Sequence, residues 1–209
     1  MLIAAELRVI FKTLMLRYSD EATAQSYWEE LLKKYTGSSR HYHNLIHLKH
    51  MIDELEPVED QVNDLDCLLF AIFYHDIIYK ATRKDNEHQS ALLFQKRISN
   101  TSFDRIETCM KQIEATKAHL RSEDKDTNIL LDLDLAILGQ PWESYETYTK
   151  QIRKEYKIYP DFMYKKGRAK AMEDILRSEQ TIFKTEYFQE RYEQKAQANI
   201  AAELKLLKK

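Results

Sequence analysis

Glycine and proline are scarce in this sequence, whose 209 residues include only three of each. Both residues interrupt helices, so their scarcity, together with abundant Lys, Glu, Leu and Gln, favours a helical chain. Strong alternation of apolar and polar residues is also lacking, and no segment has the pattern of a strand. The sequence therefore predicts an all-α fold, and its length predicts a single domain over residues 1–209.

Cysteines, long apolar runs and an excess of one charge are lacking as well. Cys67 and Cys109 are too few for a disulfide framework. No run reaches the roughly 18 apolar residues of a membrane span, and the N-terminus lacks the features of a secretory signal, so we expect a cytoplasmic protein without a membrane partner. A net charge of -2 gives no electrostatic argument for binding a nucleic-acid polymer, although it allows a local basic pocket for a phosphate.

Apolar residues recur at helical spacing between short turn signals. One such series runs from Leu45 to Leu55 and another from Leu65 to Phe73, and Gly139 before a proline marks the end of a helix. We expect a compact bundle of eight to ten helices. The last two, within residues 163–207, are expected to be long and amphipathic, to pack on the core, and to be separated near residues 181–185.

Four histidines lie within ten residues, in the segment RHYHNLIHLKH. On one helix His43, His47 and His50 would share a face, because they are separated by four and three residues. Imidazoles at that spacing can approach one metal ion or one substrate, whereas the alternative is a solvated polar face. His41, His50 and His88 are each assigned a solvated or structural role.

A His-Asp doublet interrupts a second, strongly apolar segment. His75 and Asp76 are the only strongly polar residues in CLLFAIFYHDIIY. A helix that is apolar on all sides is buried, so these two side chains must be paired, hydrogen-bonded or bound to a metal. A buried hydrogen bond that only shapes the core is the competing interpretation.

The third segment, ILLDLDLAIL, repeats this logic with two aspartates. Asp134 shares a helical stripe with its leucine neighbours, and Asp132 lies on a different stripe, where it could face solvent or support a ligand. Imidazole and carboxylate donors from three apolar segments suit a hydrolytic metal ion that keeps open positions. The donor types are compatible with Mn²⁺, Mg²⁺, Fe²⁺, Co²⁺, Ni²⁺ or Zn²⁺.

The ordered set His…His-Asp…Asp resembles the signature of the HD superfamily of metal-dependent phosphohydrolases. RHYHNLIHL, FYHDIIY, DNEHQSA and LDLDLAILG are more closely similar to a bacterial subgroup of predicted HD phosphohydrolases. The resemblance implies an HD-type helical domain with four metal ligands, His47, His75, Asp76 and Asp134. YHNLIH is also similar to a motif of cyclic-nucleotide phosphodiesterases, which implies that His43 is the general acid. The chain lacks their HDxxH continuation, so their specificity does not follow.

The activity that this resemblance implies is hydrolysis of a phosphoester or phosphoanhydride by water activated at the metal. The substrate is expected to be a small phosphorylated metabolite, preferably a nucleotide, and a homodimer is compatible with the sequence. Glu87 is expected to orient or deprotonate the water, while Asp85 and Asn86 are interpreted as helix caps. The candidates for substrate contacts, each with a surface or helix-end role as the alternative, are Arg40, Lys117, His119, Arg153 and Arg168.

Two other interpretations remain open at this point. Some HD-type proteins hold two irons and carry out oxygen-dependent cleavage, for which His43, His50 or His119 could supply the extra ligands. A degenerate HD domain could instead act as a ligand-binding module, although the intact ligand set argues against it. The tyrosines of the C-terminal half are interpreted as core residues rather than as a platform for stacking bases.

Overall fold

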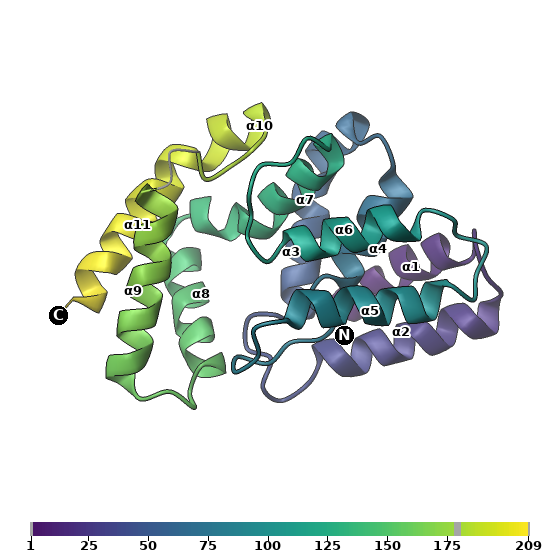
Figure 1. Ribbon diagram of the computed structural model, residues 1–209, viewed down its shortest axis with the longest axis horizontal. Helices are drawn as coiled ribbons and strands as arrows, with labels where there is room; N and C mark the ends of the chain where they lie inside the picture. The colour runs from purple at the N-terminus through teal and green to yellow at the C-terminus, as the bar shows by residue number, and fades with distance from the viewer. Residues whose placement is uncertain (1, 178–180, 209) are drawn as a thin grey trace. The chain divides into compact units, whose positions relative to one another are not determined.

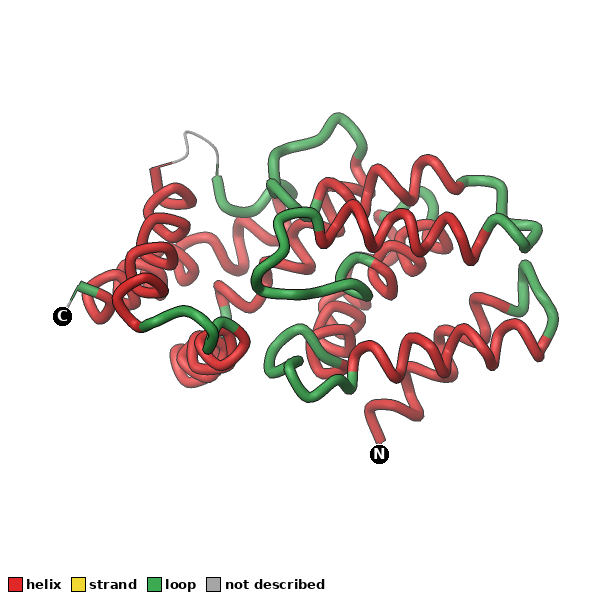
Figure 2. Tube along the Cα trace, turned by 60° about the horizontal axis from the view of Figure 1, so that its bottom comes forward, coloured by secondary structure: helices red, strands yellow, loops and turns green. Residues whose placement is uncertain are grey.

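The computed structural model describes residues 2–177 and 181–208, and within them it contains helices and loops but no strand (Figure 2). Ten of its α-helices have ten residues or more. The predicted all-α class and the predicted eight to ten helices are therefore confirmed.

Turns and longer loops connect the helical elements along the chain (Figure 1). Their bounds are α1 (Leu2–Met15), α2 (Glu21–Tyr35), α3 (Leu45–Leu55), η1 (Glu56–Gln61), α4 (Leu65–Tyr74), α5 (Asn86–Ile98), α6 (Ile106–Ala115), α7 (Lys125–Leu135), η2 (Ala136–Gly139), α8 (Trp142–Glu155), α9 (Asp161–Arg177), α10 (Glu186–Phe188), η3 (Gln189–Glu193) and α11 (Gln194–Leu207).

The chain divides into two compact units, Met1–Leu130 and Leu131–Lys209, and the boundary falls inside α7. The sequence predicted one domain with residues 163–207 packed on its core, and that arrangement stays a prediction. The predicted break near residues 181–185 agrees with the structure, because these residues lie outside the helices and α10 begins directly after them.

Helix α4 is the central element of the first unit. Seven of its ten residues are buried, which is what a helix with apolar residues on all sides requires. It contacts α1, α3, α5 and α6. Aromatic rings fill the space around it: Phe73 meets Phe11 of α1 edge to face at 5.1 Å, and Phe70 meets Phe103 at 4.8 Å. The end of α4 is therefore held from several directions.

Carboxylates and an amide fix where the helices of this unit begin. Asn44 caps α3 and Asp64 caps α4, each by accepting a backbone N–H of the first turn. Asp126, in the first turn of α7, accepts the backbone N–H groups of Asn63 and Asp64 at 2.9 and 2.8 Å. This buried carboxylate joins the start of α7 to the start of α4.

The second unit has a buried polar network between α8, α9 and α11. The Arg168 guanidinium donates to both carboxylate oxygens of Glu203, at 2.8 and 3.1 Å, and Tyr145 donates its hydroxyl proton to the same carboxylate. Arg168 also donates to the Tyr148 hydroxyl at 3.1 Å. Each buried charge therefore has a partner, as a low-dielectric interior requires.

The two helical glycines Gly139 and Gly167 should respond oppositely to alanine. A Cβ at Gly139 would lie 2.4 Å from the Cβ of Tyr192, whereas a Cβ at Gly167 meets nothing within 4 Å. We expect Gly139→Ala to lower the free energy of unfolding by about 1–3 kcal/mol through overpacking. Gly167→Ala should raise it by about 0.5–1 kcal/mol, because alanine restricts the unfolded chain and favours the helix. Chemical denaturation of both variants checks the pair, and equal effects would contradict the packing at Gly139.

Candidate metal centre

The histidine segment does not form one continuous helix. Asn44 accepts the N–H of Ile46 at 2.8 Å and donates its amide to the His41 carbonyl at 2.9 Å, and these bonds build a turn that ends where α3 begins. His47 is therefore in the first turns of α3, but His43 lies in the turn before it. The expectation that His43 shares a helical face with His47 and His50 was wrong, because the Asn44 cap starts the helix after His43.

The His-Asp doublet lies at the end of α4 rather than within a helix. His75 is the C-terminal cap residue, and its backbone N–H still bonds to the Ala71 carbonyl at 2.8 Å. Its Nδ1 lies 2.8 Å from the carbonyl oxygen of Ile72, an arrangement in which Nδ1 carries the proton and donates it. The lone pair is then on Nε2, the tautomer that such a bond imposes on metal-ligating histidines.

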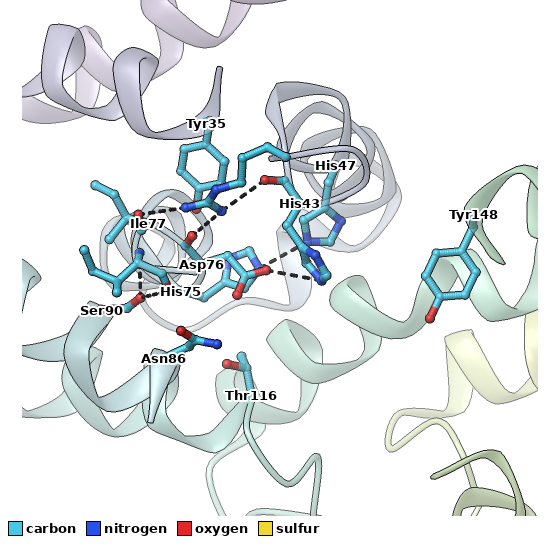
Figure 3. A network of polar contacts seen from close by, with 12 residues as sticks. Tyr35, His43, His47, His75, Asp76, Ile77, Asn86, Ser90, Thr116 and Tyr148 are labelled. Carbon is cyan, nitrogen blue, oxygen red and sulfur yellow. Dashed lines mark hydrogen bonds and ion pairs between the residues drawn. The ribbon is translucent and has the colours of Figure 1, made fainter. Parts of the chain in front are cut away.

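His47 and Asp76 each place a donor atom close to His75 in the first unit. His47 Nε2 lies 3.1 Å from His75 Nε2, and His75 Nε2 lies 3.3 Å from Oδ2 of Asp76 (Figure 3). Two ligands that are each about 2.1 Å from an ion are separated by about 3.0–3.4 Å when they subtend 90–110°. Both imidazoles are buried and Asp76 is nearly so. The spacing of the two imidazoles therefore fits a divalent metal, whereas Asp76 is in no group of described donors that all lie close enough to hold one ion, so its role as a ligand stays a prediction.

The two aspartates of the third apolar segment lie on α7, in the second unit, and the assignment of Asp134 as a metal ligand stays a prediction. Asp132, two residues earlier on α7, is fully buried and accepts the backbone N–H groups of Lys184 and Thr185 at 2.7 and 2.8 Å. Burial raises the pKa of Asp132 to about 6, and these hydrogen bonds oppose the rise. Of the two aspartates, Asp132 is thus the one with a structural role.

His43 lies beside the doublet. Its Nε2 is 3.8 Å from Oδ2 of Asp76, and its ring stacks on Tyr79 with centroids 4.1 Å apart and planes at 30°. The stacking restricts the imidazole to one orientation, facing the doublet (Figure 3). An imidazole held near the donors, but farther from Asp76 than His75 is, can exchange a proton with a molecule bound there.

Arg40 has a positioning role that the sequence did not indicate. Its guanidinium donates to the carbonyls of His43, Asp76 and Ile77 at 3.0, 2.7 and 2.9 Å, and Tyr35 donates to the Phe73 carbonyl at 3.1 Å. The carbonyls at the end of a helix have no partner within it and must be satisfied from outside. The predicted contact of Arg40 with phosphate stays a prediction, while its hydrogen bonds join the histidine turn to the doublet.

The loop after the doublet is fixed to the start of α5. Asn86 accepts the N–H of Lys80 and donates to its carbonyl, both at 3.0 Å, and Ser90 forms a similar pair with Ile78. Asp85 occupies the N-cap position, but its carboxylate accepts a hydrogen bond from the side-chain amide of Gln89 and none from a backbone N–H of the described residues. Asn86 therefore closes the loop instead of capping the helix. Glu87 follows in the first turn of α5, half-buried, and its role as a base stays a prediction.

The remaining candidates lie elsewhere in the two units. Lys117 and His119 follow the end of α6, where Lys117 is exposed and His119 has a left-handed backbone with φ of 49°. Arg153 donates to Asp161 and to two carbonyls, and the guanidinium of Arg168 is paired with Glu203, as described above. These bonds give both arginines structural partners, and their predicted contacts to substrate stay predictions.

Two of the other histidines lie beside carboxylates. His88 bonds to Glu114 at 2.6 Å on the surface, and His50 lies 3.7 Å from Glu54 one turn along α3. Burial lowers the pKa of His50, and the charge of Glu54 opposes this. Both positions agree with the structural role expected for these two residues.

Comparison of the chain with models of protein families, with curated proteins and with solved structures finds no match. The resemblance to the HD superfamily therefore depends on the sequence motifs alone. Among the described helices, none combines the length and the apolar character that crossing a membrane requires.

We expect Arg40→Met, which keeps the apolar stem, to lower the free energy of unfolding by about 2–4 kcal/mol, because three carbonyls lose a charged donor. The matched control is Arg8→Met, which removes an exposed arginine with one bond to Gln25. The control should change the free energy by less than about 0.5 kcal/mol. Urea denaturation of both variants measures the difference, and similar values would show that the Arg40 bonds contribute little.

Asp132 and Asp134 offer a second matched pair, since each can be changed to asparagine on the same helix. Asp134→Asn should abolish tight binding of Mn²⁺ while the protein keeps its helical content and melting temperature. Asp132→Asn should lower the melting temperature, because the carboxylate that joins Lys184 and Thr185 to α7 loses an acceptor oxygen. Metal titration and thermal melts of both variants test the assignment. Loss of metal binding in Asp132→Asn but not in Asp134→Asn would show that Asp132 is the ligand and Asp134 is not.

Proposed function

We propose that this protein is a metal-dependent phosphohydrolase of the HD type, which cleaves a phosphoester or phosphoanhydride of a small phosphorylated molecule. The observation that carries the proposal is the approach of two buried imidazole nitrogens, 3.1 Å apart, at the end of α4, where the carboxylate of Asp76 lies 3.3 Å from His75. Asp134 of the second unit is proposed as a further ligand from the resemblance.

The chemistry of the donors supports a hydrolytic ion rather than a structural one. Two neutral imidazoles and two carboxylates balance the charge of a divalent cation, and they leave coordination positions for water and substrate. Both cysteines, Cys67 and Cys109, are buried in the core and neither belongs to this group of donors. His47, His75, Asp76 and Asp134 would hold the ion, and the bound ion would lower the pKa of a water molecule and polarise a phosphoryl oxygen.

The other residues of the site have distinct roles in this proposal. His43 is the proton donor to the leaving oxygen, since its imidazole is stacked on Tyr79 and faces the doublet without belonging to the closest donor group. Arg40 is a positioning residue, because its guanidinium holds the carbonyls of His43 and Asp76 at once. Glu87 remains the candidate for orienting the water, and its half-buried place in the first turn of α5 permits this.

The substrate class is proposed from the resemblance to the HD superfamily together with the site chemistry. A nucleotide is preferred, and Lys117, His119, Arg153 and Arg168 remain the proposed substrate contacts. Mn²⁺, Mg²⁺, Fe²⁺, Co²⁺, Ni²⁺ and Zn²⁺ are all compatible with nitrogen and oxygen donors. A panel of nucleoside mono-, di- and triphosphates, run with each of these ions, is the first assay.

The proposal predicts that His47→Ala and His43→Ala fail in different ways. His47→Ala removes a ligand, so bound metal and hydrolysis should be lost together. His43→Ala should keep the metal and lose about 10²–10⁴-fold in turnover on substrates with poor leaving groups. A nitrophenyl phosphodiester needs little protonation of its leaving group and should be affected much less. Metal content by elemental analysis and turnover on both substrates are the measurements.

His88→Ala is the matched control, since His88 is an exposed histidine paired with Glu114 away from the doublet. It should leave both metal content and turnover unchanged. Equal losses on both substrates, or depletion of metal in His43→Ala, would identify His43 as a ligand. Two irons per chain would then favour an HD-type oxygenase, and failure to bind any divalent metal would favour a ligand-binding module.

A further inference from the structure

A second pocket lies behind the end of α4, within the first unit. It has a volume of about 790 Å³, within the range of roughly 300–1,000 Å³ that is typical of ligand pockets. Its walls are the second half of α2, the turn that follows it, the segment of residues 77–80 after the doublet, and Arg97 of α5.

The pocket is lined by more cations than carboxylates. The cationic residues are Lys33, Lys34, Arg40, Lys80 and Arg97, and the carboxylates are Glu29 and Glu30. Arg97 and Glu30 neutralise each other through two hydrogen bonds, at 2.7 and 2.9 Å. In the part of the chain that the structure describes, none of the three lysines makes a salt bridge or a side-chain hydrogen bond. The positive charges of the three lysines outnumber the one remaining carboxylate, Glu29, so the pocket has a net positive charge.

The placement of the lysines argues for a ligand rather than for support of a helix. Lys33 and Lys34 are in the last turn of α2, where basic residues also complement the helix dipole. Lys80 lies outside any helix, in the segment after the doublet, so the dipole does not account for it. Like charges that face one empty volume repel each other, and an anion between them removes that cost.

Polar groups of the turn after α2 add to this charge. The pocket is lined by Gly37 and Ser39, and across the described residues their backbone N–H groups donate no hydrogen bond to the protein. Arg40 uses three of its five guanidinium N–H groups on carbonyls of the neighbouring chain. Backbone amides, lysines and arginines are the groups that donate hydrogen bonds to phosphate oxygens in proteins.

We propose that this pocket binds the phosphate groups of a small anionic ligand, at a site separate from the metal centre. The ligand carries at least two negative charges, to match the excess of cations. The pocket shares three residues with the surroundings of the doublet, namely Arg40, Ile77 and Tyr79. A ligand bound here therefore contacts the residues that orient His43 and the Asp76 backbone, which suits a regulatory anion.

Calorimetric titration of the metal-free full chain with inorganic pyrophosphate tests the proposal without metal and without hydrolysis, so its result is independent of the proposed function. The triple variant Lys33→Gln, Lys34→Gln, Lys80→Gln should bind about tenfold more weakly or worse, since each lost charged donor is worth on that order. The matched control is Lys111→Gln, Lys125→Gln, Lys165→Gln, which removes the same charge from exposed lysines outside the pocket.

The control variant should bind pyrophosphate with unchanged affinity, and circular dichroism should show that both variants are folded. Equal weakening in the two variants would overturn the proposal, because net charge alone would then explain binding. Absence of measurable binding by the unaltered chain would also overturn it. So would binding that is lost in His47→Ala but kept in the pocket variant, since the anion would then occupy the metal centre.

Discussion

The buried end of helix α4 is the constraint on which the candidate site depends. A helix ends with carbonyls that have no partner within it, and this end lies in the core of its unit, away from water. Tyr35 and the Nδ1 of His75 donate to the carbonyls of Phe73 and Ile72 in the last turn, and Arg40 donates to the carbonyls of Asp76 and Ile77 that follow it. The same bonds that satisfy the backbone thus fix the doublet. Each lost donor would leave a buried polar group, so the arrangement is strongly determined.

This constraint also explains why the donor atoms can be preorganised without a bound ion. His75 directs Nε2 towards His47 because its other nitrogen is already committed, and Arg40 joins the histidine turn to the doublet through the His43 carbonyl. His43 is oriented separately, by stacking on Tyr79. The proposed ligands and the proposed proton donor are thereby held by different contacts, which would let such a site keep a metal while one imidazole exchanges protons.

The two aspartates of α7 show how one short segment can carry two unlike roles. Asp132 and Asp134 differ by two positions and so face different sides of the helix. Asp132 is enclosed and satisfied by Lys184 and Thr185, which is a structural bond within the second unit. Asp134 is instead the proposed metal ligand. Arg40 likewise has two roles: it lines the pocket next to the end of α4, and its guanidinium bonds to the backbone of the doublet.

The sequence by itself determined the helical class, the helices around α4, and the residue types of the metal donors. These properties follow from local signals: few helix breakers, a helical apolar period, and polar residues within apolar segments. Such signals can be read from the sequence without knowledge of the tertiary structure. Tertiary structure alone decided that Arg40 is a positioning residue, that Asp132 is structural, and that His43 lies outside α3. These outcomes depend on which carbonyls and amides are brought close by distant segments, and spacing along the chain does not encode those distances.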